Sequence, residues 1–183
     1  MGTTTEISWT QRTWNPWRGC TKVSAGCTNC YMFRDQKRYG RNPAEVVRTK
    51  TWRDPIKWER AASEAGNKYL VFTCSWSDWF HKDADPWREE AWEIVRSCPN
   101  LVFQILTKRA DRIADHLPAD WDSGYENVWV GVTIEDQEAT WRISYLLAVP
   151  AAVRWISSEP LLGPVNFEPW IKHLDWIIAG AES

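Results

Sequence analysis

The sequence predicts an α/β domain, a partial (βα)6 TIM-like barrel of parallel strands that lacks its C-terminal helix. Two observations support this prediction: short apolar runs alternate with stretches of helical periodicity, and each of the later runs ends in a cluster of polar residues. Repeated alternation of strand and helix is typical of right-handed βα units with parallel strands. Ligand sites in such folds lie at the carboxyl ends of the strands, so polar residues after every later strand favour a barrel over an open sheet.

The predicted strands are apolar runs at positions 7–10, 69–74, 101–106, 128–132, 153–156 and 176–179, and the first of them is the weakest. The predicted helices lie between them, at 44–65, 86–97, 108–116, 137–148 and 167–173. Ile113 and Leu117 are four residues apart, which gives the third helix an apolar face. Only a few residues follow the last run. Because an uncovered parallel strand is unstable, we expect the natural chain to continue or another element to cover that edge.

The composition is that of one globular domain over residues 1–183. Hydrophobic residues make up 44% of the chain and charged residues 25%, both ordinary for a soluble protein. The formal net charge of −2 provides no global basic field for a nucleic acid. No run of 18 apolar residues is present and the first residues do not resemble a signal peptide, so we expect no membrane span and a cytoplasmic location. The 15 tryptophans indicate a thick aromatic core.

Three of the five cysteines, Cys20, Cys27 and Cys30, lie within eleven residues. In a reducing compartment such a cluster indicates a metal site rather than disulfides. A structural zinc site normally completes four ligands, and no histidine lies near this loop in the sequence. A [4Fe–4S] cluster held by three thiolates leaves one iron open, as catalysis requires, so the spacing favours an iron–sulfur site. A zinc ion and uncoordinated thiols remain the alternatives.

The three-cysteine loop, residues 14–31, and motifs spread over most of the chain resemble an uncharacterised family of phage and bacterial three-cysteine-motif proteins of the radical SAM type. The resemblance lies in residues 9–20, 75–81, 106–109, 131–135 and 158–163. It implies a radical SAM fold, a [4Fe–4S] cluster and S-adenosylmethionine (SAM), which is cleaved reductively to give a 5′-deoxyadenosyl radical. It also implies a flavodoxin- or ferredoxin-like electron donor and, for a phage protein, the cytoplasm of a bacterial host. No substrate follows from it.

Two features depart from the radical SAM pattern. The first two cysteines are separated by six residues instead of the usual three. The Gly-Gly-Glu stretch that commonly holds the methionyl amine is absent, and Asp78 is the acidic residue in its place.

Polar residues at the predicted strand ends are the candidates for binding SAM: Asp78, Lys108, Arg109, Thr133, Glu135, Glu159 and Glu182. A cation at the end of the third strand, Lys108 or Arg109, suits the SAM carboxylate. Thr133 and Glu135, after the fourth predicted strand, suit the ribose hydroxyls of SAM. Glu159 and Glu182 suit the SAM amine or the substrate. Helix capping and surface ion pairs are the competing interpretation for each of them.

The stretch after the cysteines is locally basic. It contains Arg34, Lys37, Arg38, Arg41, Arg48, Lys50 and Arg53, with Trp52 and Trp58 nearby. Basic residues interleaved with aromatic ones are typical of nucleic-acid binding, so modification or repair of a nucleic acid is one hypothesis for the reaction. A solvated helical face explains the same charges.

Two other classes of protein stay open. One is a non-catalytic binding module, stabilised by zinc or a cluster, for nucleic acid or a host protein. The other is an electron-transfer protein whose cluster is completed by a fourth cysteine, with Cys74 and Cys98 the candidates.

Overall fold

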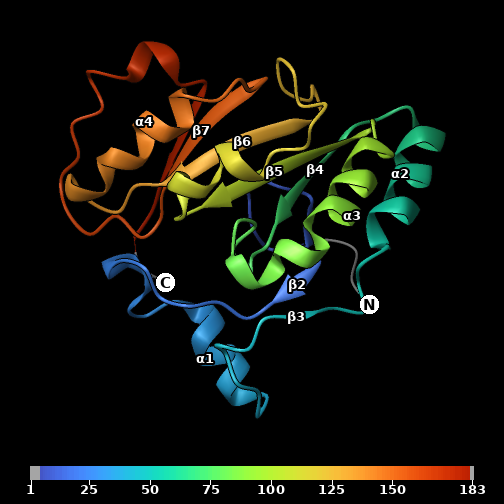
Figure 1. Cartoon of the computed structure of the whole chain (residues 1–183), viewed down its shortest axis with the longest axis horizontal. Coiled ribbons are helices and arrows are strands. Elements are labelled where there is room, and N and C mark those ends of the chain that lie inside the picture. Colours follow the sequence, from blue (N-terminus) through green and yellow to red (C-terminus); the bar gives the residue numbers. More distant parts are fainter. Residues whose placement is uncertain (1–4, 182–183) are drawn as a thin grey trace.

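Figure 1 shows the computed structural model, which describes residues 5–181 as a six-stranded sheet with its helices. The strands lie in the order β1-β4-β5-β6-β7-β8, and every neighbouring pair is parallel. They span Arg12–Trp14 (β1), Tyr69–Thr73 (β4), Leu101–Thr107 (β5), Val128–Thr133 (β6), Val153–Ser158 (β7) and Trp176–Ala179 (β8). A second, antiparallel sheet joins β2 (Trp17–Arg18) to β3 (Val47–Arg48).

Four α-helices accompany the strands: α1 (Tyr31–Arg38), α2 (Asp54–Ala65), α3 (Asp85–Arg96) and α4 (Trp141–Leu147). Both α2 and α3 begin with Asp-Pro, which suits the first turn because proline needs no hydrogen-bond acceptor there and the carboxylate meets the positive end of the helix dipole. The described residues, 5–181, also contain six 3-10 helices: η1 (Ala25–Cys27), η2 (Lys82–Ala84), η3 (Ala110–Arg112), η4 (Ala114–His116), η5 (Glu138–Thr140) and η6 (Ile171–His173). No helix in residues 5–181 is long and apolar enough to cross a membrane.

The predicted α/β class and the parallel six-stranded sheet are confirmed. The strands follow one another in chain order without reversal, as they do in the wall of a barrel and not in a doubly wound sheet. Between residues 5 and 181, β1 and β8 do not pair with each other, so the structure shows no closed barrel.

One tryptophan shows that the sheet is curved. The ring centroid of Trp9 lies 4.9 Å from that of Phe72 on β4, 5.6 Å from that of Trp155 on β7 and 5.8 Å from that of Trp176 on β8. Four steps separate β4 from β8, a span of about 19 Å in a flat sheet. One indole ring contacts both strands, so the sheet must bend around it into a trough.

The outer face of this trough carries the main core. Valines and other apolar residues of β4 to β7 pack there against α2, α3 and α4 in one continuous cluster. Tryptophans form a connected chain through it, with ring centroids 5.8 Å apart for Trp14–Trp79, 5.0 Å for Trp79–Trp92 and 5.5 Å for Trp92–Trp121. The predicted aromatic core is therefore present, and most of the tryptophans serve packing.

Four of the predicted elements were wrong. The helix predicted at 167–173 is only the 3-10 helix η6, Ile171–His173. The first strand lies at Arg12–Trp14 and not at 7–10. The helix predicted at 44–65 begins only at Asp54, because the residues before it contain β-branched Val47, which pairs in β3. The helix predicted at 108–116 is replaced by η3 and η4, since Arg109 turns its side chain into a buried ion pair instead of starting a regular helix. The helix α1 was not predicted.

Candidate functional site

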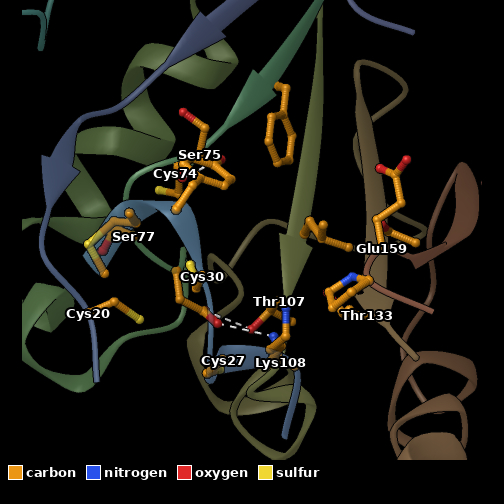
Figure 2. Close-up of a pocket in the computed structure, with 18 of the residues that line it drawn as sticks. Cys20, Cys27, Cys30, Cys74, Ser75, Ser77, Thr107, Lys108, Thr133 and Glu159 are labelled. Atoms are coloured by element: carbon orange, nitrogen blue, oxygen red, sulfur yellow. Dashed lines mark hydrogen bonds between the residues drawn. The ribbon is translucent and has the colours of Figure 1, made fainter. Parts of the chain in front are cut away.

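A cavity of about 430 Å³ opens at the carboxyl end of the sheet (Figure 2). Its lining comes from the segments that follow every strand of the large sheet: Cys20, Cys74, Lys108, Thr133, Glu159 and Ala181 are examples, in strand order. This volume lies within the range of about 300–1,000 Å³ that small-molecule sites occupy. Residues from the carboxyl ends of all six strands therefore line one cavity, including those of the five later strands whose polar ends predicted a common site.

The three clustered cysteines all line this cavity, and Figure 2 shows them on one side of it with Thr133 and Glu159 on the other. Gly19 sets the approach to Cys20: its φ is +94°, and a Cβ atom there would lie 2.1 Å from the carbonyl oxygen of Glu45. Cys27 ends η1, and Cys30 is the N-cap of α1. The N-terminus of α1, which is the positive end of the helix dipole, therefore lies at Cys30.

Cys20 lies beside a buried cation. Arg109 Nη1 donates to Cys20 Sγ at 3.5 Å, and Arg109 Nη2 donates to both the carbonyl and the hydroxyl oxygen of Thr21 at 2.9 Å. Burial, followed by the charge of Asp78, raises the pKa of the Cys20 thiol to about 11, while Arg109 opposes the shift. At neutral pH the Cys20 thiol therefore keeps its proton.

Asp78 holds Arg109 in place. Asp78 Oδ2 accepts from Arg109 Nη1 at 3.0 Å and from the Lys108 backbone N–H at 3.1 Å. Asp78 Oδ1 accepts from Thr107 Oγ1 at 2.7 Å and from the Phe80 backbone N–H at 2.9 Å. Both members of the ion pair are buried. The structure therefore brings Asp78 and Arg109 together, with the guanidinium directed at the cysteine loop.

A second buried ion pair holds the other part of the loop. Glu135, which follows β6, accepts a hydrogen bond from Ser24 and pairs with Arg142 of α4. Arg142 Nη1 also donates to the Thr133 carbonyl at 2.6 Å. Gly26 lies directly against this carboxylate, since a Cβ atom there would be 2.4 Å from Glu135 Cγ. Sequence reasoning missed Ser24, Gly26 and Arg142, because no local pattern links residues 111 positions apart such as Ser24 and Glu135.

Lys108 and Glu159 are the predicted site residues with free charges. Both line the cavity, and neither side chain forms a hydrogen bond or ion pair with another residue in the described part of the chain. Gly180 makes room for Glu159, because a Cβ atom there would lie 2.5 Å from Glu159 Oε1. Thr133 lines the cavity between them as a neutral polar group. Glu182 lies outside the described residues.

The two remaining cysteines, Cys74 and Cys98, differ in their position relative to the cavity. Cys74 follows β4, lines the same cavity and has a φ of +58°, unusual for a residue with a side chain. Burial raises the pKa of its thiol, and the charge of Asp78 adds to the effect. Cys98 is buried outside the cavity. Of the two candidates for a fourth thiol ligand, the structure brings only Cys74 to the other three cysteines.

The basic stretch divides between two places. Arg34, Lys37 and Arg38 lie on α1, whose first residues line the cavity. Arg48 belongs instead to β3, where it pairs with Glu90 and stacks 3.6 Å over the ring of the buried Trp52. The predicted aromatic partner Trp52 is therefore a packing residue.

The chain was compared with known proteins. Residues 4–183 match a family model whose description reads "Protein of unknown function (DUF5131)". No curated protein and no solved structure matches the chain. The chemistry of the site has to be inferred from its own residues.

Proposed function

The chain belongs to the DUF5131 family, and we propose that it is a radical-SAM-type enzyme whose [4Fe–4S] cluster is held by Cys20, Cys27 and Cys30. The observation that carries this proposal is that all three thiols of one loop open on a single cavity at the carboxyl end of the parallel sheet. The curved sheet with strands in chain order supports the finer assignment as well, a partial (βα)6 barrel of the radical SAM type.

The donor set fits a cluster better than a single metal ion. Between residues 5 and 181, no group of three or more His, Cys, Asp and Glu side chains is arranged to hold one ion. Each thiolate in a zinc site lies about 2.3 Å from the metal, so two sulfur atoms are at most about 4.6 Å apart. The thiolates of a four-iron cluster bind separate iron atoms and stand further apart. The three cysteines share one cavity without converging on one point, an arrangement that suits separate iron atoms better than a single ion.

The charges around the cysteines also suit such a group. Three thiolates bring negative charge into a partly buried loop, and Arg109 and the N-terminus of α1 are the positive groups that face it. In this proposal Asp78, Arg109 and Glu135 orient the cysteine loop. Their predicted contacts with SAM are replaced by this positioning role, because their charges are already paired with protein groups.

The free charges of the cavity suit the amino-acid part of SAM, which carries one carboxylate and one ammonium group. We assign the carboxylate to Lys108 and the ammonium to Glu159, with Thr133 as the hydrogen-bonding partner of the ribose. Cys20, Cys27 and Cys30 would hold the cluster, which, once reduced by the electron donor, would supply the electron for cleavage of SAM to methionine and a 5′-deoxyadenosyl radical. The rings of Trp9 and Phe72 contribute apolar surface to the cavity lining, which suits a reaction that protects a radical from water. A flavodoxin- or ferredoxin-like protein is the expected electron donor.

One alternative has its own supporting observation. Because Cys74 lines the same cavity, a cluster with four thiolates and no open iron would make this an electron-transfer protein. A third possibility is a binding module without catalysis, in which the metal only stabilises the fold.

The test uses the full chain, reconstituted with iron and sulfide without oxygen. We expect about four irons per chain, an EPR signal of the reduced protein that shifts when SAM is added, and formation of 5′-deoxyadenosine. The variants Cys20→Ala, Cys27→Ala and Cys30→Ala should each lose the cluster, whereas Cys98→Ala, a buried cysteine outside the cavity, should retain it.

The variant Cys74→Ala decides between the enzyme and the electron carrier. Retention of the cluster and of the SAM-dependent EPR shift supports an open iron, and loss of the cluster in this variant supports a fourth thiolate. Stoichiometric zinc, or iron content that is indifferent to the three clustered cysteines, would reject the enzyme and leave a binding module.

A further inference from the structure

We propose that the substrate of this site is a single-stranded nucleic acid, whose backbone lies along the basic patch formed by Arg34, Lys37, Arg38 and Arg41. The proposal deepens the function proposed above by naming its substrate class. Binding of the strand, however, can be measured apart from the reaction.

The patch presents its charges on one side of α1. Arg34, Lys37 and Arg38 are three and four residues apart, a spacing that places them on one helical face, and Arg41 follows after the turn at Gly40. All four are exposed. Within residues 5–181, Arg34 pairs only with its neighbour Asp35, at 3.5 Å, and the other three have no carboxylate within 4.0 Å.

The opposite side of α1 anchors the helix. Met32 and Gln36 are buried there, and Gln36 Oε1 accepts from Arg18 Nη1 at 3.2 Å. The patch is therefore held on a fixed support. Like charges at this spacing on a helix repel one another. A polyanion laid along the patch relieves that repulsion and releases counterions.

An aromatic pair continues the patch. Tyr39 is 59% exposed, its ring centroid lies 6.2 Å from that of Trp76, and the Arg41 guanidinium lies 5.4 Å from the centre of the Tyr39 ring. Exposed aromatic rings beside cations are the platforms on which unpaired bases stack. Neither a lipid headgroup nor an acidic protein needs such a ring, so the aromatic pair favours a nucleic acid among the possible anionic partners.

The same elements lead into the cavity. Tyr31 and Phe33, from the first turn of α1, line it, and Trp76 lies between Ser75 and Ser77, which line it too. Tyr31 Oη donates to the Ser75 carbonyl at 2.7 Å and joins the two segments. A base stacked on Tyr39 is thus next to the rim of the site. Stacking and entry into the cavity both require an unpaired base, which selects a single strand over a duplex.

The first experiment measures binding of fluorescein-labelled oligo(dT) and oligo(U) of about 15 nucleotides to the reconstituted full chain by anisotropy, over a series of salt concentrations. The patch variant is Lys37→Ala/Arg38→Ala/Arg41→Ala. The control is Lys57→Ala/Arg60→Ala/Lys68→Ala, which removes three exposed cations near α2. Each phosphate contact adds about 0.7 to the log–log salt slope for a single strand, so the patch variant should bind more weakly with a slope reduced by about 2. The control should bind like the unchanged chain.

The second variant tests stacking separately from charge. Tyr39→Ala should weaken binding about 5- to 100-fold, the effect of one base–aromatic stack, without changing the salt slope. Tyr39→Phe should bind normally. Tyr145→Ala, an exposed tyrosine on α4 with 45% of its surface accessible, is the matched control.

Equal weakening by the patch and control triples, or normal binding by Tyr39→Ala, would overturn the proposal. So would binding of phosphatidylserine vesicles without binding of either oligonucleotide. Iron content and the SAM-dependent EPR shift are measured on the same variants. Patch-dependent binding by a protein that forms no cluster rejects the enzyme alone, and a normal SAM response without patch-dependent binding rejects only the nucleic-acid substrate.

Discussion

The four hydrogen bonds to the Asp78 carboxylate explain why Arg109 can be buried next to a cysteine. A guanidinium taken out of water needs a counter-charge, and a buried carboxylate needs donors for its lone pairs. Asp78 meets both needs, with Thr107 and two backbone N–H groups as its further donors. The cost of removing one partner is therefore the cost of leaving the other charged group buried and unpaired.

We expect Arg109→Leu to lower the free energy of unfolding by about 3–5 kcal/mol, because it leaves the buried Asp78 charge without its partner. Arg34→Leu makes the same change in an exposed ion pair and should lower it by less than about 1 kcal/mol. Urea denaturation of the metal-free proteins measures both. Similar values for the two variants would mean that the Asp78–Arg109 pair does not behave as a buried pair.

His81 makes the stability of the same network depend on pH. Burial, and then the charge of Arg109, lower the pKa of His81 below its usual value of 6.5. Its Nδ1 accepts from the Asp83 backbone N–H at 3.2 Å, which leaves Nε2 to donate to Thr21 Oγ1 at 3.1 Å. The unfolded chain therefore takes up this proton first as the pH falls. The contribution of neutral His81 to the free energy of unfolding is fully present above about pH 6.5. It is lost as the pH falls below this value towards the pKa of His81 in the folded chain.

We expect His81→Asn to show a smaller decrease in unfolding free energy between about pH 7.5 and pH 5.5 than the unchanged chain. Asparagine is a good N-cap and can accept from the Asp83 N–H, but it has no proton to gain in this range. Denaturation at the two pH values gives the comparison, with the exposed His173→Asn as the control. If the pH dependence is unchanged in His81→Asn, groups other than His81 cause it.

At the scale of elements, the cysteine loop is fixed from two sides. Arg109, from the end of β5, holds Cys20 and Thr21, and Glu135, from the end of β6, holds Ser24 and lies against Gly26. The loop itself has little regular structure, so these two strand ends determine where its thiols lie.

Gly26→Ala tests the second of these contacts. The added methyl group would overlap the buried Glu135 side chain, so we expect the free energy of unfolding to decrease by about 1–3 kcal/mol and the iron bound after reconstitution to decrease with it. The control is Gly163→Ala, where the new Cβ would lie 3.8 Å from Asp136, an ordinary contact distance. Full iron binding by Gly26→Ala would show that the loop can move without losing its metal site.

The central strands, which are buried on both faces of the sheet, could be predicted from the sequence. The segments that build the site could not. The runs at 101–106 and 128–132 are apolar except for Gln104, and they form β5 and β6 within one residue of the predicted ends. Residues 108–116 have helical spacing, yet Arg109 is drawn into the buried ion pair and the helix breaks into two short turns. Local periodicity carries no information about such a distant partner.

At the scale of the whole molecule, the trough is filled by aromatic rings. Trp155 lies flat against β6 because Gly131 has no side chain: a Cβ atom there would be 2.5 Å from the Trp155 indole. Trp155 stacks in turn on Trp176, 5.3 Å away between ring centroids, and Trp9 covers both. The sequence predicted an aromatic core and a single site whose residues come from the ends of the strands. It did not indicate that one N-terminal indole joins the two sides of the sheet, because that contact depends on the curvature.

Trp9→Ala should therefore reduce the free energy of unfolding by about 3 kcal/mol, the lower end of the range for core aromatic residues, since Trp9 is only partly buried. Trp141→Ala, at a tryptophan that is 47% exposed on α4, should reduce it by less than about 1 kcal/mol. Urea denaturation compares the two. Equal effects would mean that Trp9 contributes no more to the fold than a surface ring does.

The contacts of Trp9 also set an order of events during synthesis on the ribosome. The cysteine loop leaves the ribosome early, but its two anchors, Arg109 and Glu135, are made much later, and the strand that completes the trough is made last. Until then the three thiols lack the contacts that fix them in the folded chain. Long-range pairing is slow to form, so in the proposed enzyme the nascent chain would have a period in which to receive its cluster before the fold closes around it.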